Sequence, residues 1–220
     1  MQELVLLTVD ERTGRLRSTR EFATTYALVG AVFFDLALAR KIDTDTESVQ
    51  IIDTTPTGNV MLDRVLAHMV RRSELKTVTE WIEEIYHCNE DLEGEALRSL
   101  IACGVLRHEK SKLLWIIDLE RFPMVDDKPQ QHTKTRLAHA ILSDEIPPAR
   151  HIMLVSIAEA CGLLGYVLTQ DALAARRKRI QMLCDIETIS RKVIDAIQAL
   201  EIKSAQPVTN GPHSARPPEN

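Results

Sequence analysis

Glycine and aromatic residues are scarce in this chain: glycine accounts for 8 of the 220 residues, and aromatic side chains for 4%. Folds made only of strands need many glycine-rich turns and many aromatic or β-branched strand residues. The composition therefore argues against an all-β fold. A hydrophobic content of 45% and a charged content of 27% are ordinary for a globular protein. At this length we expect a compact, mainly α-helical single domain.

Long uninterrupted apolar runs are also missing. The longest one, residues 27–39, contains Gly30 and Asp35 and is shorter than the roughly 20 residues that span a bilayer. The first seven residues carry Glu3 and no basic side chain, so they do not resemble a secretory signal peptide. We therefore expect a cytoplasmic protein that is soluble or lies on a membrane surface without crossing it.

Cysteine is infrequent, and its positions are far apart: Cys88, Cys103, Cys161 and Cys184. Most of them lie within apolar helical patterns. Buried, reduced thiols are the usual state of such residues in a cytosolic protein. The pattern therefore predicts free thiols and no disulfide framework.

The motifs of common enzymes are absent. The sequence contains no G-x-G-x-x-G, no Walker-type lysine loop, no G-x-S-x-G, no H-E-x-x-H and no C-x-x-C. Its seven histidines are scattered. His87, Cys88 and Glu90 are neighbours at a predicted helix end, where side chains so close in sequence diverge in direction. We predict a protein that is not an enzyme and that uses neither a metal nor another cofactor.

The hydrophobic pattern divides the chain into short segments that are mostly helical. Residues 22–40 are apolar on nearly all sides, as expected for a central core helix. Asn59 is placed to cap the helix that follows it, and Thr77 with Glu80 forms a capping box for the next one. Gly104 is placed to end a helix of residues 92–103. Further helices are predicted at residues 133–142, from Pro147-Pro148 to Cys161, and from about 171 to 202.

Irregular or extended structure is predicted elsewhere. Residues 3–9 and 15–16 flank the segment Asp10-Glu11-Arg12-Thr13-Gly14, which indicates a β-turn connection. A short strand is expected at residues 49–53 and a polar loop at 123–132. Residues 1–203 show no repeat and no linker, whereas 204–220 contain almost nothing that can be buried. We therefore predict one domain over residues 1–203 and a disordered tail over 204–220.

Residues 104–119 predict a β-hairpin inside an otherwise helical sequence. Two short apolar segments flank a charged segment, residues 109–112, which we assign to the turn. The second arm, residues 113–117, is an unbroken apolar run that contains Trp115, one of two tryptophans. An isolated hairpin is only marginally stable in water. The outer face of this arm is therefore expected to meet the protein core, another chain or a membrane.

A basic run of four residues stands out in a chain whose net charge is −5. That net charge disfavours binding of nucleic acid or anionic lipid over the whole surface, so any such binding needs a local basic patch. The run is one solvated face of an amphipathic helix or a patch that faces anions, where each basic residue near an anionic bilayer contributes about 1 kcal/mol. Its members are Arg176, Arg177, Lys178 and Arg179.

The helix at 78–86, the helix at 92–103 and the hairpin together have the order of a winged helix. In that motif the second helix reads DNA. Here that helix begins with Glu90, Asp91, Glu93 and Glu95, which phosphates would repel. The pattern favours the winged-helix shape and disfavours nucleic-acid binding.

In order and spacing, several short motifs resemble the Golgi phosphoprotein 3 family, which includes the yeast vacuolar sorting protein 74. The resemblance covers about residues 3–200. It rests on the segments Leu6-Leu7, Asp10-Glu11-Arg12-Thr13-Gly14, Leu36-Ala37-Leu38, Pro56-Thr57-Gly58-Asn59, Leu62-Asp63, Thr77-Val78, Trp81-Ile82-Glu83, Gly104-Val105-Leu106 and Glu109-Lys110. Because a long N-terminal extension is absent, the chain looks like a short bacterial-type member.

The resemblance implies a helical domain with a projecting hairpin that serves in oligomer formation and membrane insertion. It also implies peripheral membrane association through phosphatidylinositol 4-phosphate and capture of short cytosolic tails of glycosyltransferases. In the family, one tryptophan and three arginines form the lipid-headgroup pocket. Those positions carry over to Arg20, Val29, Glu90 and Glu93 in this sequence. Two acids there would repel a phosphomonoester, so the family's pocket is not matched.

Two functions from different classes follow. The first is a non-enzymatic peripheral membrane adaptor that contacts anionic lipid through Leu113, Leu114 and Trp115, assisted by residues 176–179. The second is a soluble homo-oligomeric scaffold in which the hairpin docks onto a neighbouring subunit. A winged-helix nucleic-acid binder is the least favoured interpretation.

Overall fold

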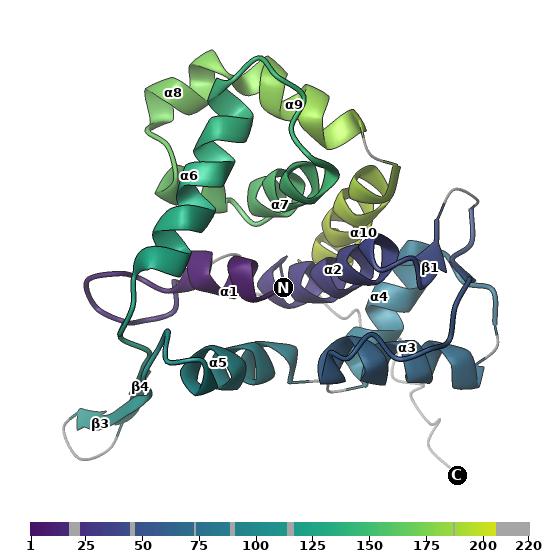
Figure 1. The fold of residues 1–220 in the computed structure, drawn as a ribbon, viewed down its shortest axis with the longest axis horizontal. Coiled ribbons are helices and arrows are strands. Elements are labelled where there is room, and N and C mark those ends of the chain that lie inside the picture. The colour runs from purple at the N-terminus through teal and green to yellow at the C-terminus, as the bar shows by residue number, and fades with distance from the viewer. Residues whose placement is uncertain are drawn as a thin grey trace, which may run out of the picture.

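The computed structural model describes residues 1–17, 23–44, 47–72, 74–88, 91–113, 117–186 and 188–205. Over these residues the chain is a mainly helical single domain with ten α-helices and two short antiparallel two-stranded sheets, as predicted (Figure 1). The elements of the first half are α1 (Gln2–Thr8), α2 (Ala23–Leu38), β1 (Ile42–Asp43), β2 (Gln50–Ile51), α3 (Val60–Arg72), α4 (Val78–His87) and α5 (Leu92–Ala102). Those of the second half are β3 (Glu109–Leu113), β4 (Ile117–Arg121), α6 (Lys128–Leu142), α7 (Ala149–Ala160), the 3-10 helix η1 (Leu163–Tyr166), α8 (Gln170–Ala175), α9 (Arg177–Ile186) and α10 (Thr188–Ala205).

Helix α2 is the central element, as its all-round apolar sequence predicted. It contacts α3, α4, α5, α7 and α10, and nearly every described side chain from Tyr26 to Leu36 is buried. Gly30 allows the closest approach, because a Cβ atom there would lie 2.4 Å from Cγ1 of Val193 in α10. The absence of that side chain lets α10 pack directly on α2.

The N-terminal segment is a helix, and the predicted extended structure at residues 3–9 is wrong. Leu4 to Leu7 are all buried within α1, and a short continuous apolar run has no period that separates a buried helix from a buried strand. Tertiary contacts decide the outcome. The side-chain amide of Gln130 in α6 donates to the backbone oxygens of Leu6 and Val9 at the end of this helix.

Helix α6 begins at Lys128, within the predicted polar loop at 123–132. Pro129 stands in its first turn, where proline is well tolerated. Gln130 and Thr133 are buried although they are polar. The hydroxyl of Thr133 donates to the Pro129 oxygen, and the amide N–H groups of Gln130 donate to α1, so the donors of both side chains are satisfied inside the protein. Because residues 128–132 are polar, they were predicted as a loop, although the helix already begins at Lys128.

The predicted helix caps at Asn59, Thr77 and Gly104 and the helix start after Pro148 are confirmed. The side-chain oxygen of Asn59 accepts a hydrogen bond of 3.0 Å from the Met61 backbone N–H. Thr77 and Glu80 form the expected capping box, and Gly104 follows α5 with φ of +72°. Helix α7 starts after Pro148. The strand expected at residues 49–53 is β2, which pairs with β1 in the register Ile42 to Ile51.

Two further predictions fare differently. All four cysteines are free, as predicted, but Cys88 and Cys103 are exposed and only Cys161 is fully buried. Helix α10 continues to Ala205, and residues 206–220 lie outside the described part of the chain. The domain boundary at 203 and the disordered tail stay predictions. Among the described helices, none is long and apolar enough to cross a membrane.

A carboxylate with an arginine, a lysine and a histidine as neighbours links α3 to α4. Glu84 of α4 accepts hydrogen bonds from Arg72 Nε at 2.8 Å and from Lys76 Nζ, and His68 Nε2 lies 2.8 Å from it. Burial alone would raise the pKa of Glu84. The hydrogen bonds from Lys76 and His68 and the charges of Lys76 and Arg72 outweigh burial and lower the pKa from 4.5 to about 2.

This cluster predicts a defined acid dependence of stability. A carboxyl whose pKa is lowered in the folded state stabilises the protein above its unfolded pKa, and the effect is lost as the pH falls from about 4.5 towards about 2. We expect Glu84→Gln to lower the free energy of unfolding at neutral pH and to approach the wild type at acidic pH. Urea unfolding over a pH series measures this difference.

The control is Glu74→Gln. Glu74 also pairs with Lys76, at 2.9 Å, but its side chain is 59% exposed, so its loss should change stability little at any pH. Equal effects of the two substitutions would contradict the assignment of this role to Glu84.

Candidate functional site

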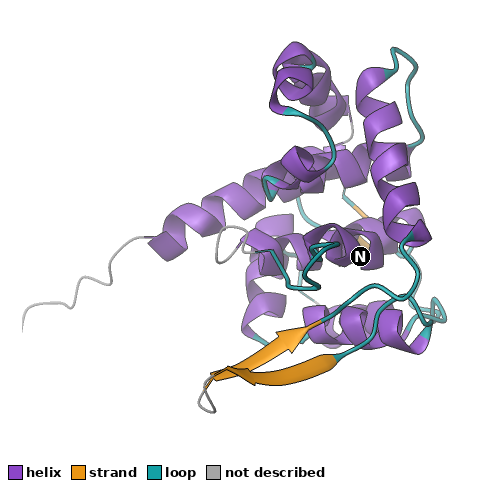
Figure 2. Ribbon diagram, turned by 90° about the vertical axis from the view of Figure 1, so that its left-hand side faces the viewer, coloured by secondary structure: helices purple, strands orange, loops and turns teal. Residues whose placement is uncertain are grey.

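The predicted hairpin is present, but residues 109–112 do not form its turn. Residues 109–112, assigned to the turn, belong to strand β3, which runs to Leu113 and pairs with β4 so that Leu113 is opposite Ile117. Leu114, Trp115 and Ile116, which join the strands, lie outside the described residues, as do the side chains of residues 111–119. Figure 2 shows both strands projecting from the helical body.

Opposite charges that face each other across the two strands explain why the charged residues 109–112 lie in a strand and not in the turn. The register places Glu109 opposite Arg121 and Lys110 opposite Glu120, and the ammonium of Lys110 lies 2.9 Å from the Glu120 carboxylate. Such cross-strand pairs stabilise a ladder that is solvated on both faces. A run of charged residues therefore does not identify the turn in a projecting ribbon.

The corrected register changes the position of the apolar run 113–117. It is not one arm of the ribbon: Leu113 and Ile117 are the paired residues farthest from the helical body, and 114–116 connect them. The ribbon below them is rich in charge. Of the predicted contact residues Leu113, Leu114 and Trp115, the structure describes only the backbone of Leu113, at the end of β3.

The foot of the hairpin is packed against the helical body. Phe122 is buried, and the ring of His108 stacks on it with centroids 5.1 Å apart. The Arg107 N–H donates to the Pro123 oxygen at 3.0 Å, and the Val125 N–H donates to the Val105 oxygen at 2.9 Å. The ribbon thus starts from a rigid base.

The basic run is divided by the break between α8 and α9 at Arg176. Arg176 pairs with Asp144 at 2.9 Å and donates to the Leu142 oxygen at 2.6 Å, and Arg177 pairs with Glu159. Arg179 donates to the backbone oxygens of Ala140 and Glu145. These three arginines hold α9 and its N-terminal flank to α6, to α7 and to the loop between them.

Lys178 is different from the other members of the run. Its side chain is exposed and makes no hydrogen bond or ion pair with another described residue. Most of the basic run is therefore committed to contacts inside the protein, and Lys178 is the member with a charge directed to solvent.

The predicted headgroup positions do not assemble in the described residues. Val29 is 1% exposed within α2, so it lines no surface pocket. Glu93 is half-buried in the first turn of α5, where burial, and then the charge of Asp91, raise its pKa. Arg20 and Glu90 lie outside the described residues. A half-buried acid with a raised pKa offers no attraction for a phosphate.

Helices α4 and α5 and the strands β3 and β4 follow one another in the predicted winged-helix order. Glu93 and Glu95 occupy the first turn of α5, and Glu95 forms a two-pronged ion pair with Arg64. The first turn of this helix carries acidic side chains, whereas a helix that reads DNA needs basic side chains.

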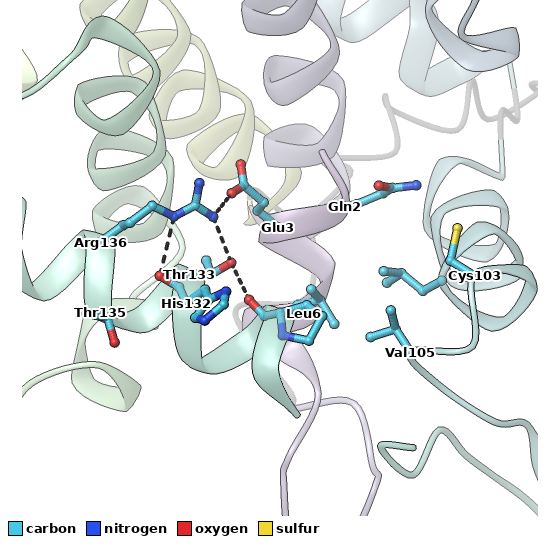
Figure 3. Close-up of a pocket in the computed structure, with 11 residues that line it drawn as sticks. Gln2, Glu3, Leu6, Cys103, Val105, His132, Thr133, Thr135 and Arg136 are labelled. Atoms are coloured by element: carbon cyan, nitrogen blue, oxygen red, sulfur yellow. Dashed lines mark hydrogen bonds and ion pairs between the residues drawn. The ribbon is translucent and has the colours of Figure 1, made fainter. Parts of the chain in front are cut away.

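A cavity of about 600 Å³ opens beside the foot of the hairpin, between α1, α5 and α6 (Figure 3). Leu6, Leu100 and Val105 supply apolar walls. Arg136 lies at the rim and pairs with Glu3. Burial opposes the ionisation of Glu3, but Arg150 and Arg136 outweigh it and lower the pKa of the carboxyl.

This cavity was not predicted from the sequence, because its walls come from three segments that are far apart in the chain. Its volume falls in the range of ligand-binding sites in proteins. The only local signal is a polar side, Glu3 and Gln2, on an otherwise buried short helix.

A model of the protein family described as Golgi phosphoprotein 3 (GPP34) matches residues 1–200. The chain is also similar to the vacuolar protein sorting-associated protein 74 of Eremothecium gossypii. The two are 23% identical over 163 residues, which is 64% of this chain and 48% of that protein. The chain thus spans about half the length of this curated relative.

The arginine contacts predict that neighbouring members of the basic run differ in role. We expect Arg179→Gln to lower the free energy of unfolding by about 1.5–3 kcal/mol, because two backbone oxygens lose a charged donor. Lys178→Gln should change it by less than about 0.5 kcal/mol. Chemical denaturation of both variants measures the difference, and equal losses would contradict it.

Proposed function

Because this chain belongs to the Golgi phosphoprotein 3 family, we propose that it is a peripheral membrane adaptor that contacts anionic lipid through the end of its hairpin. The family is non-enzymatic, and its members associate peripherally with Golgi membranes. The missing enzyme motifs agree with the first property. The specific lipid and the client proteins are proposals that rest on the sequence resemblance.

The position of the apolar run 113–117 carries this proposal. Leu113 and Ile117 are the last paired residues of two strands whose other residues are mostly charged, and the residues between them in the sequence are apolar. Such a segment is poorly suited to burial in the core of the same chain. It is well suited to a shallow wedge in a bilayer interface, where tryptophan is favoured. Removal of apolar surface from water contributes roughly 25 cal/mol per Å².

The lipid contact proposed here does not use the family's headgroup pocket. Val29 is buried, and Glu93 is an acid held in a half-buried site. Phosphatidylinositol 4-phosphate, the lipid that the family is known for, is therefore expected to bind no better than other anionic lipids of equal charge. Lys178 supplies a solvent-facing positive charge.

Short protein tails are the proposed clients. The cavity between α1, α5 and α6 supports this part of the proposal, since it has apolar walls and a charged rim. It lies beside Val105, directly before the hairpin, so a tail bound there would enter close to the membrane-contacting ribbon.

Co-sedimentation with liposomes tests the membrane contact. We expect wild-type protein to sediment at low salt with vesicles that contain anionic lipid. The double substitution Leu114→Ser with Trp115→Ala should weaken partitioning at least about tenfold, since a loss of about 1.4 kcal/mol gives that factor.

Tryptophan fluorescence is a second measurement of the same contact. The emission of Trp115 should shift to shorter wavelength on binding, whereas the emission of Trp81, which is 1% exposed, should stay constant.

Leu75→Ser is the matched control, because Leu75 is 76% exposed and lies outside the hairpin. It should bind vesicles like the wild type. Vesicles with phosphatidylinositol 4-phosphate, compared with vesicles of equal charge from another lipid, separate the family's lipid specificity from general anionic binding. Wild-type protein that stays in the supernatant would exclude the membrane contact.

The second candidate is a homo-oligomeric scaffold in which the hairpin end docks on a neighbouring subunit. The same distal apolar run supports it. Light scattering of the wild type and of the Leu114→Ser, Trp115→Ala variant distinguishes the candidates: an oligomer that the double substitution dissociates supports the scaffold. A strict monomer that binds vesicles excludes it.

A further inference from the structure

The turn of residues 10–14 lies against the foot of the hairpin, more than a hundred positions away in sequence. We propose that this turn is a positioning element that sets the direction in which the hairpin leaves the helical body, and that Gly14 is its essential residue. The proposal deepens the proposed function of the hairpin end and rests on it.

Direct backbone contact joins the turn to the hairpin's return strand. The Phe122 N–H, one residue after β4, donates to the Gly14 oxygen at 2.6 Å. A Cβ atom on Gly14 would lie 2.7 Å from the nitrogen of Pro123 and 2.9 Å from its Cα. Both are backbone atoms, so the chain after the hairpin could not accommodate this Cβ without moving. Gly14 also has φ of +66°, which disfavours any side chain.

The turn itself is fixed by hydrogen bonds. Asp10 Oδ1 accepts from the N–H and the hydroxyl of Thr13, both at 2.8 Å. The hydrogen bond from the Thr13 hydroxyl is the largest of the effects that hold the pKa of Asp10 below its ordinary value. The Asp10 N–H donates to the Arg15 oxygen at 2.8 Å. A turn closed in this way transmits displacement instead of absorbing it.

Both neighbouring helices hold the turn. Arg17 donates to the backbone oxygens of Leu7 and Val9 at the end of α1, each at 3.0 Å. Glu11 pairs with Lys134 of α6. The turn therefore connects α1 and α6 to the chain segment that leaves the hairpin.

Other contacts at the foot have different roles. The Val105 N–H donates to the Leu100 oxygen of α5 at 2.9 Å, and Phe122 is buried in the core, so these contacts attach the foot itself to the helical body. The hydrogen bonds between Val105 and Val125, and between Arg107 and Pro123, join the two flanks of the hairpin to each other. They close the ribbon, whereas the contact with Gly14 ties its return strand to the turn that α1 and α6 hold. The direction of the distal end is therefore expected to depend on the turn.

The test compares two glycines with the same backbone strain. Gly162 has φ of +68°, close to that of Gly14, but a Cβ atom there would meet nothing within 4 Å. Gly14→Ala and Gly162→Ala should therefore carry similar strain in the left-handed region. Only Gly14→Ala should displace the hairpin.

The first readout is the distance between spin labels at Lys110→Cys in β3 and Thr135→Cys in α6, with Cys88 and Cys103 replaced by serine. Gly14→Ala should shift or broaden the distance distribution, and Gly162→Ala should leave it unchanged. The second readout is vesicle co-sedimentation, which should fall several-fold for Gly14→Ala alone. Asp10→Ala, which loosens the turn without a clash, should give a smaller change of the same kind.

The two readouts fail separately. If the wild type does not bind vesicles, the proposed function is wrong, but the spin-label distances still test the positioning role. An unchanged distance distribution in folded Gly14→Ala and Asp10→Ala overturns the positioning role. Equal effects of Gly14→Ala and Gly162→Ala on either readout do the same, since they would reflect stability alone.

Discussion

The requirement that α2 be covered on every side organises this protein. A helix without a polar face needs neighbours all round, and α3, α4, α5, α7 and α10 supply them. Gly30 brings α10 within direct contact. The other helices can then keep one polar face each, and the projecting hairpin is left as the principal element with little part in this core.

Polar groups hold the shell of helices together at a few points. Glu84 forms ion pairs with Arg72 of α3 and with Lys76, which precedes α4. Gln130 donates a hydrogen bond to the backbone at the end of α1. Arg179 donates to the backbone oxygen of Glu145, shortly after α6. Each of these side chains belongs to a type that is usually exposed. Each is held inward because a backbone oxygen or an opposite charge meets it there.

This inward use of polar groups bears on function. Three of the four residues in the basic run bind other parts of the protein, and the headgroup positions offer a buried valine and a half-buried acid. The element that the fold leaves directed outward is the hairpin of β3 and β4, whose strands are rich in charged residues. Its foot rests on Gly14, and a cavity opens beside it. The foot of the hairpin, the turn at Gly14 and the cavity thus lie close to one another beside α1.

Local chemistry was enough to determine the helical class, the core helix, the caps at Asn59 and Thr77, and the existence of the hairpin. These features depend on residues close in sequence. Tertiary structure alone decided that residues 2–8 are helical. Their continuous apolar run has no hydrophobic period that separates helix from strand, and the hydrogen bonds from Gln130 to the end of this helix come from a distant segment. It also decided the hairpin register through cross-strand charge pairs, the inward contacts of Arg179, and the meeting of Gly14 with Pro123. These outcomes depend on partners distant along the chain, which no local pattern can specify.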